Sequence, residues 1–323
     1  MRKRLMMRPQ MLQGLVLAQS RGFSLLSALL VAAGVALLAA CGPAAQPEHH
    51  APPKAAASAS TPLTADEQAL QARLPEKVES DTTHAWVMDA ILGKPRQVIK
   101  TIGILVYDGV NDLDMMGPRY VLGQAGAKTR LVAVKPGPIK TVMGVQVVPD
   151  AVIDDVQQLD ILIIPGGFTG TIEASYDKRV LDWIRAIDKG TVYTGAVCSG
   201  VWILGATGLL EGKRASTNWY REEEFLKKYK AIPANERYTR DGKYWTSAGV
   251  TAGMDMSLAI LNDNWGEKYT QGVMLDMEYD PAPPITGGTP EKTGKLVAWM
   301  MKAMYDAGIN PLIEKLEKQR AKP

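Results

Sequence analysis

The chain has 323 residues, of which 46% are hydrophobic and 22% charged, and its formal net charge is +3. Five basic residues and no acidic ones stand among the first forty; without these five, 32 Lys and Arg face 34 Asp and Glu, a net charge of −2. The apparent basicity therefore belongs to the N-terminal segment, and no nucleic-acid partner is expected from the charge.

The first forty residues have the layout of a secretory signal: a basic start, an uncharged run from Phe23 to Ala40, and small residues at the exit. The exit, LAAC at 38–41, resembles the bacterial lipobox, which implies cleavage before Cys41 and lipidation of its thiol. A retained membrane anchor is the alternative, because the run is about long enough to cross a bilayer. Gly42, where an aspartate would resemble an inner-membrane retention signal, favours an exported lipoprotein on the periplasmic face of the outer membrane.

Residues 41–63 are rich in Pro, Ala and Ser without an apolar period, which predicts a disordered tether that joins the membrane anchor to the rest of the chain. Residues 64–98 are expected to form a short helical spacer, with one helix from about Ala65 to Leu74 and a second segment that ends at Gly93.

The cysteine and histidine content limits the kinds of site that the chain can build. With Cys41 lipidated, Cys198 has no partner for an intramolecular disulfide. The three histidines, His49, His50 and His84, all precede the regular part of the chain, so no zinc site and no other metal or cofactor is expected.

From residue 99 onward, buried-looking apolar runs alternate with helical patterns. Strands are expected within 99–109, 128–136, 144–153, 159–167 and 191–198, and helices within 114–126, 176–190, 199–210 and 251–266. A hairpin is expected at 238–249, and a last helix starting at Thr289-Pro290. This alternation favours a mostly parallel sheet covered on both faces, in one α/β domain over 99–310 followed by a helical tail at 311–323.

The segment AVCSG at 196–200 predicts a nucleophile elbow, a sharp turn that carries Cys198 between a strand and a helix. Ala196 and Gly200 are small enough for such a turn, and the start of the helix would lower the pKa of the thiol. The alternative is an inert buried cysteine, which most free cysteines are.

Two further loops with unusual residues follow expected strands, where open α/β sheets bind ligands. In IIPGGF, Gly166 and Gly167 free the backbone to direct N–H groups, with that of Ser199, at developing negative charge, although a plain tight turn explains them equally well. In YDGVNDLDMMGP, Asn111 or Asp112 suits a helix N-cap. Asp114 suits either the helix dipole or an acid/base group facing Cys198.

These loops, with AVCSGVWILGATGLLEGKRAST, WTSAGVTAGMDMSLAI and MEYDPAPP, resemble the ThiJ/PfpI family of the class I glutamine amidotransferase-like superfamily, and within it the isonitrile hydratase-like branch. The resemblance covers about 100–306 and implies a flavodoxin-like three-layer sandwich. It matches Cys198 to the elbow nucleophile, Asp114 to the neighbouring acidic residue, and Gly167 with the Ser199 backbone to the oxyanion site. Ser199 also stands where the branch has a threonine hydroxyl.

One position departs from the family. Asn218 stands where a histidine is common, and no histidine follows His84. The resemblance therefore implies a cysteine–carboxylate pair rather than a histidine-activated cysteine, with Asn218 orienting substrate or water.

The resulting expectation is a lipid-anchored, cysteine-dependent hydratase or hydrolase of a small molecule. The competing expectation is a ligand-binding or thiol redox-sensing module of the same fold. Relatives suggest a possible homodimer.

Overall fold

The computed structural model describes residues 62–72 and 94–321. The expected signal segment, Cys41, almost all of the tether, and residues 73–93 of the spacer lie outside the described residues. Within the spacer, helix α2 spans Ala65–Gln71, inside the stretch where a helix is expected. None of the helices in the two described ranges combines the length and the hydrophobicity needed to span a bilayer.

The domain is built on a seven-stranded sheet in the order β10-β11-β7-β6-β1-β2-β5. The strands are β1 (Thr101–Val106), β2 (Lys128–Ala133), β5 (Ala151–Val152), β6 (Ile161–Ile164), β7 (Tyr193–Val197), β10 (Tyr238–Asp241) and β11 (Tyr244–Ser247). Neighbouring strands run parallel, except that β10 and β11 form an antiparallel hairpin. The strands expected at 99–109, 128–136, 159–167 and 191–198 and the hairpin at 238–249 are all in this sheet, whereas the stretch expected at 144–153 contributes only β5 to it.

The central strands are apolar along their whole length because helices cover both of their faces. All residues of β6 and β7 are buried, as are all but the first of β1. Ile104 of β1 pairs with Leu131 of β2 on one side and with Ile163 of β6 on the other. After β1 the chain continues to β2 on one side of it, and it later returns to form β6 on the other side. Open α/β sheets bind ligands at the carboxyl ends of the strands where the strand order reverses in this way.

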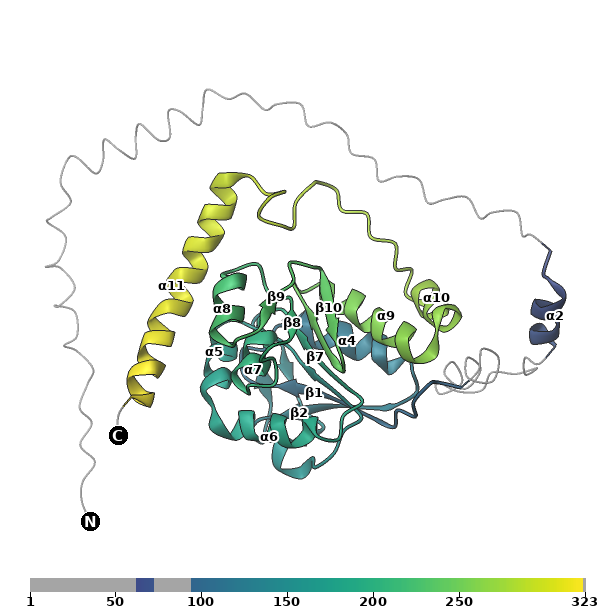
Figure 1. The fold of residues 1–323 in the computed structure, drawn as a ribbon, viewed down its shortest axis with the longest axis horizontal. Helices are drawn as coiled ribbons and strands as arrows, with labels where there is room; N and C mark the ends of the chain where they lie inside the picture. Colours follow the sequence, from purple (N-terminus) through teal and green to yellow (C-terminus); the bar gives the residue numbers. More distant parts are fainter. Residues whose placement is uncertain (1–61, 73–93, 322–323) are drawn as a thin grey trace, which may run out of the picture. The chain divides into compact units, whose positions relative to one another are not determined.

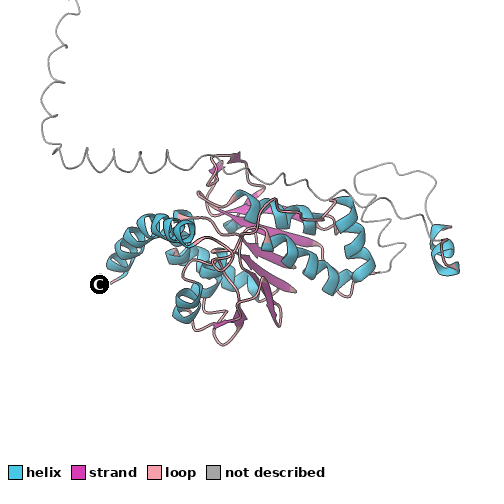
Figure 2. Ribbon diagram, turned by 90° about the horizontal axis from the view of Figure 1, so that it is seen from above, coloured by secondary structure: helices cyan, strands magenta, loops and turns pink. Residues whose placement is uncertain are grey.

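Helices form a layer on each face of the sheet (Figures 1 and 2). One layer contains α4 (Asp112–Gly123), α9 (Ala252–Trp265) and α10 (Glu267–Asp276), which pack on one another. The other contains α5 (Thr169–Tyr176), α6 (Lys178–Asp188) and α7 (Gly200–Ala206), with α8 (Glu222–Lys228) packed on α7. This is the predicted three-layer α/β sandwich of the flavodoxin-like type.

Several short elements lie outside the main sheet. Strands β3 (Ile139–Lys140) and β4 (Gln146–Val147) form a small hairpin, and β8 (Arg214–Ala215) pairs with β9 (Ile232–Pro233). A 3-10 turn, η1, covers Ile153–Asp155. These pairs are two residues long, so no periodicity in the sequence could indicate them.

The last helix, α11, spans Lys295–Arg320 and packs on α5. The prediction that it starts at Thr289-Pro290 is wrong: Thr289 caps an isolated turn, accepting the Lys292 N–H, and Gly294 then has extended backbone. The boundary expected at residue 310 falls inside this helix, because α11 continues through Pro311. A proline removes one helical hydrogen bond, which a long helix packed along one side can tolerate.

Candidate functional site

The three loops singled out in the sequence meet at one end of the sheet. Cys198 follows β7, Gly166 and Gly167 follow β6, and Asp114 lies in the first turn of α4, just after β1. Since β7, β6 and β1 are adjacent and parallel, their carboxyl ends lie side by side. The predicted convergence of these residues is therefore what the fold produces.

Cys198 occupies the bend between β7 and α7, with a φ of 57° that is rare for any residue other than glycine. Its N–H donates to the carbonyl of Ser247 at 3.0 Å, and the Thr217 hydroxyl donates to its carbonyl at 2.7 Å. At Gly200, a Cβ atom would lie 2.1 Å from the carbonyl oxygen of Ile164, so only glycine fits the start of α7. Strained backbone held by such contacts is typical of functional turns.

The sulfur of Cys198 has a direct polar partner in Asn218. The side-chain amide of Asn218 donates to Sγ at 3.2 Å, and its own oxygen accepts the Tyr220 N–H at 2.9 Å. That second bond fixes which end of the amide faces the sulfur. Asn218 therefore contacts the thiol itself, and its expected role in orienting substrate or water stays a prediction.

Asp114 is a fully buried carboxyl placed by the cap of its helix. Asn111 is the N-cap of α4, and its side chain accepts the N–H groups of Leu113 and Asp114. Oδ2 of Asp114 accepts the Gly166 N–H at 3.0 Å, whereas Oδ1 is buried without a hydrogen-bond partner. Burial raises the pKa of Asp114 to about 7, although the Gly166 amide and the Cys198 thiol both lower it.

Burial and the negative charge of Asp114 both raise the pKa of the Cys198 thiol. The bonds from Asn218 and from the Ser199 backbone lower it by less. The expectation of an acidic thiol is therefore wrong for this structure. Cys198 as a whole residue is only 5% exposed, and α7, with seven residues, supplies little dipole to offset the cost of burying a charge.

The two glycines after β6 differ in what their N–H groups do. The Gly166 N–H is taken up by Asp114, so it does not serve as the free oxyanion donor that the sequence suggested. The Gly167 N–H donates to the Ser199 hydroxyl at 3.1 Å, and that hydroxyl donates to the Gly167 carbonyl. A Cβ at Gly166 would lie 2.6 Å from the Ser199 hydroxyl, which explains why this loop needs glycine.

A set of hydroxyl groups that sequence reasoning missed ties the loops together. The Tyr107 hydroxyl donates to the Pro165 carbonyl at 2.8 Å and lies 3.0 Å from the Thr171 hydroxyl. Ser199 Oγ lies 3.4 Å from the same Thr171 hydroxyl. Tyr107 directly follows the carboxyl end of β1. This position was the signal in the sequence that could have indicated a role for Tyr107 in the site.

Tyr305 of α11 is a second residue that the sequence did not indicate. Burial and the negative charges of Cys198 and Asp114 raise the pKa of Tyr305, while a hydrogen bond from Asn218 lowers it. Tyr305 therefore lies near enough to the thiol for their charges to influence one another, although more than one hundred residues separate the two along the chain. Among the described residues, no cluster of three His, Cys, Asp or Glu side chains is placed to hold a metal ion.

Comparison with known proteins places these features in a family. The model of the DJ-1/PfpI family matches residues 100–263. The isonitrile hydratase of Pseudomonas putida is 37% identical over 191 residues, which cover 59% of this chain and 83% of that protein. The HTH-type transcriptional regulator CdhR of Pseudomonas aeruginosa is 29% identical over 126 residues, 39% of this chain but only 37% of the regulator. The crystal structure of a ThiJ/PfpI family protein from Pseudomonas syringae matches with a TM-score of 0.64 and 31% identity, over 68% of this chain and 91% of that one.

Proposed function

This chain belongs to the DJ-1/PfpI family, and we propose that it is a cysteine-dependent hydratase or hydrolase of a small molecule, with an isonitrile as substrate. The observation that carries the proposal is a buried thiol that shares its site with a buried carboxyl whose pKa is about 7. The likeness to an isonitrile hydratase supports this choice of substrate over the other small molecules that the family fold can bind.

The pairing of Cys198 with Asp114 defines the reactive protonation state. Near neutral pH the pair holds one proton, and moving it from sulfur to carboxylate gives a thiolate beside a carboxylic acid. The unpaired Oδ1 of Asp114 is free to receive that proton. Asn218, which donates to the sulfur, stabilises the thiolate formed in this way.

An isonitrile carbon can accept both the proton and the sulfur. The thiolate forms a C–S bond to the terminal carbon while Asp114 returns its proton to the same carbon, so that the thiol adds across it to give a thioimidate. Water then adds to this carbon, passing one proton through Asp114 to the nitrogen. Breaking the C–S bond, with the second proton of the water going to sulfur, releases an N-substituted formamide and restores the thiol.

Ser199 and Gly167 are placed to assist the second half of this sequence. The Ser199 hydroxyl, hydrogen-bonded to Gly167, lies beside the bend that carries the nucleophile. We assign it the positioning of the attacking water, and we assign the Ser199 N–H the stabilisation of charge that develops on the substrate. The Gly167 N–H can share this role only when the Ser199 hydroxyl releases it.

The test is turnover of a panel of isonitriles, nitriles and amides by the wild type, Cys198→Ala and Asp114→Asn. We expect formamide production from isonitriles that Cys198→Ala abolishes and that Asp114→Asn lowers about 100-fold or more. Asp112→Asn is the matched control, because Asp112 lies in the same helical turn but bonds to Thr141 and Met143. Turnover that persists in Cys198→Ala, or no turnover of any compound by the wild type, contradicts the proposal.

A redox sensor of the same fold would react through the same thiolate. Peroxides oxidise the thiolate, and burial beside Asp114 raises the pKa of Cys198, so oxidation too would need Asp114 to take the thiol proton. Stoichiometric oxidation of Cys198 by peroxide, without turnover of any compound in the panel, would favour the sensor.

We further propose that the enzyme is exported and held in the membrane by lipid on Cys41, which rests on the leader and on the exit sequence LAAC. Mass spectrometry of the mature N-terminus tests it. The expected result is a chain that begins at a lipid-modified Cys41, with release from the membrane in Cys41→Ser. An unmodified chain that still carries residues 1–40 contradicts it.

A further inference from the structure

Tyr305 lies between the two loops that flank the sulfur of Cys198. Its ring centre is 5.3 Å from that of Phe168, which directly follows Gly167, in an edge-on contact. On the other side it is 5.5 Å from the ring of Trp219 and 4.9 Å from that of Tyr220, which directly follow Asn218. The ring therefore bridges the Gly167 side and the Asn218 side of the site.

The backbone of α11 comes close to the same loop one turn further on. A Cβ at Gly308 would lie 2.3 Å from the Phe168 ring, so the helix can approach this near only because residue 308 has no side chain. Next to it, Ile309 is 1% exposed. In this arrangement Cys198, Asn218 and Asp114 are all at most 5% exposed, so almost none of the thiol residue faces solvent.

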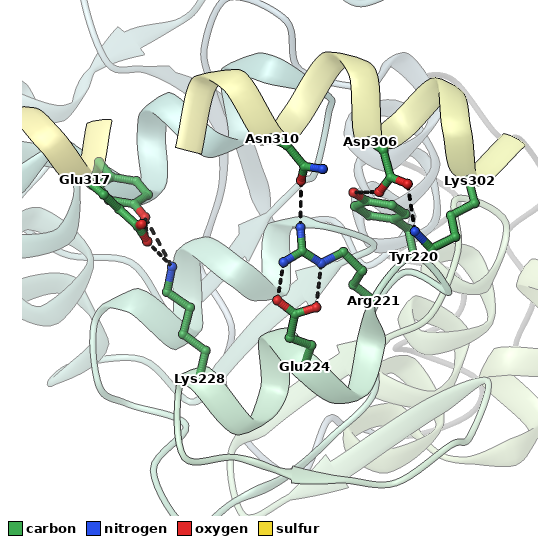
Figure 3. A network of polar contacts seen from close by, with 9 residues as sticks. Tyr220, Arg221, Glu224, Lys228, Lys302, Asp306, Asn310 and Glu317 are labelled. Atoms are coloured by element: carbon green, nitrogen blue, oxygen red, sulfur yellow. Dashed lines mark hydrogen bonds and ion pairs between the residues drawn. The ribbon is translucent and has the colours of Figure 1, made fainter. Parts of the chain in front are cut away.

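Helix α11 is held by apolar contacts and by polar contacts near the surface. Ile309, Leu312, Ile313 and Leu316 belong to an apolar cluster with residues of α5, α7 and α8, and polar contacts join α8 and the turn before it to α11 (Figure 3). Tyr220 donates to Asp306 at 2.7 Å and Arg221 donates to Asn310 at 2.8 Å. Lys228 pairs with Glu317 at 3.2 Å, with the two side chains 40% and 55% exposed. Exposed pairs of this kind contribute little to stability, so α11 is held chiefly by the apolar cluster around Ile309, which is far smaller than the core around the sheet.

The connection into α11 leaves room for movement. Residues 281–294, which join the domain to the helix, contain neither helix nor strand and are almost entirely exposed. Segments with few buried contacts open at low free-energy cost.

From this arrangement we propose that α11 is a gate over the Cys198 site and that Tyr305 determines both access and substrate choice. The gate opens to admit the substrate and then closes, which brings Tyr305 into contact with the substituent on the isonitrile nitrogen. This inference deepens the proposed function and rests on it for the identity of the substrate, but not for the gate itself.

The side chains around Tyr305 indicate which group that is. Phe168, Trp219 and Tyr220 present aromatic rings and no charge. The charged residues near the α8–α11 contact already have partners: Glu224 accepts from Arg221, Arg221 also donates to Asn310, and Asp306 accepts from Tyr220. A neutral aromatic substituent, as in a benzyl isonitrile, fits these rings by stacking and edge contacts, whereas a charged one would lose its hydration without a partner.

The first test needs no turnover. Alkylation of Cys198 by iodoacetamide is followed by mass spectrometry of its peptide in the full chain, across pH, so that the limiting rate is separated from the pKa. Tyr305→Ala should raise the limiting rate at least about tenfold, as expected where a minor open state otherwise carries the reaction. Tyr305→Phe keeps the ring and should stay close to the wild type. Trp299→Ala, on the exposed side of α11, is the matched control and should change nothing.

The second test compares kcat/KM for benzyl and methyl isonitriles in the same variants. Tyr305→Ala should reduce the preference for the benzyl compound, measured as its kcat/KM divided by that of the methyl compound, by about tenfold. Tyr305→Phe should keep most of this preference. Equal alkylation rates in all variants overturn the gate, and an unchanged ratio overturns the role in substrate choice. If the wild type turns over no isonitrile, the proposed function fails while the alkylation rates still decide on the gate.

Discussion

Replacing Asp114 by asparagine should remove activity and at the same time change how stability depends on pH. Asp114 is 0% exposed, and its pKa rises from 3.8 to about 7 because burial penalises the charged form. An acid with a raised pKa in the folded state favours folding while it is protonated. Its contribution is fully present below pH 3.8 and is lost as pH rises through about 7.

The size of this effect follows from the shift. Each pKa unit corresponds to about 1.36 kcal/mol, so a rise from 3.8 to about 7 amounts to roughly 4 kcal/mol in the free energy of unfolding. Asparagine has nearly the same shape, can still accept the Gly166 N–H, and does not ionise. Relative to the wild type, Asp114→Asn should therefore gain up to about 4 kcal/mol between pH 4 and pH 8.

The assay is urea unfolding of both proteins at several pH values, with the difference in unfolding free energy taken at each one. Other titrating groups are shared by the two proteins, so they largely cancel in that difference. A difference that stays flat from about pH 4 to 8 would show that Asp114 ionises as an ordinary surface carboxyl and would refute the reasoning.

Three further predictions follow from the same geometry. First, kcat/KM should rise with pH up to an apparent pKa near 7 and then level off, because the carboxylate of Asp114 must accept the thiol proton, and Asp114→Asn should remove this rise. Second, Asn218→Ala should raise the pKa of the thiol further, measured by the pH dependence of alkylation, and lower kcat/KM about tenfold or more, because it removes a bond to a charged sulfur. An unchanged alkylation profile would contradict that role. Third, Gly166→Ala should lower the unfolding free energy by about 1–3 kcal/mol through its clash with Ser199, whereas Gly249→Ala, whose Cβ meets nothing within 4 Å, should not.

The sequence predicted the fold well where the pattern is local. The apolar runs at 159–167 and 191–198 contain β6 and β7, because strands buried on both faces must be apolar throughout. The sharp turn at Cys198 was predicted from the small residues on either side of it, and the φ of 57° at Cys198 confirms the bend. The convergence of Cys198, Asp114 and Gly166 then needed only the rule that parallel strands end at one edge of a sheet.

What the sequence did not predict depends on distant parts of the chain. The protonation state of Cys198 depends on how deeply the rest of the chain buries it, and no local pattern reports burial of that kind. The contact of Asn218 with the sulfur needs the register of the loop after β8. The position of Tyr305 needs the packing of a helix that starts almost one hundred residues after the elbow.

The central claim, that the sulfur of Cys198 bonds to the substrate, is tested most directly by the intact mass of the protein after acid quenching during turnover. The expected spectrum shows an adduct on Cys198 heavier by the mass of one whole isonitrile, absent in Cys198→Ala. The account would be contradicted if no such adduct forms even when the reaction is quenched within the time of one turnover, 1/kcat, and if Cys198→Ala keeps full activity.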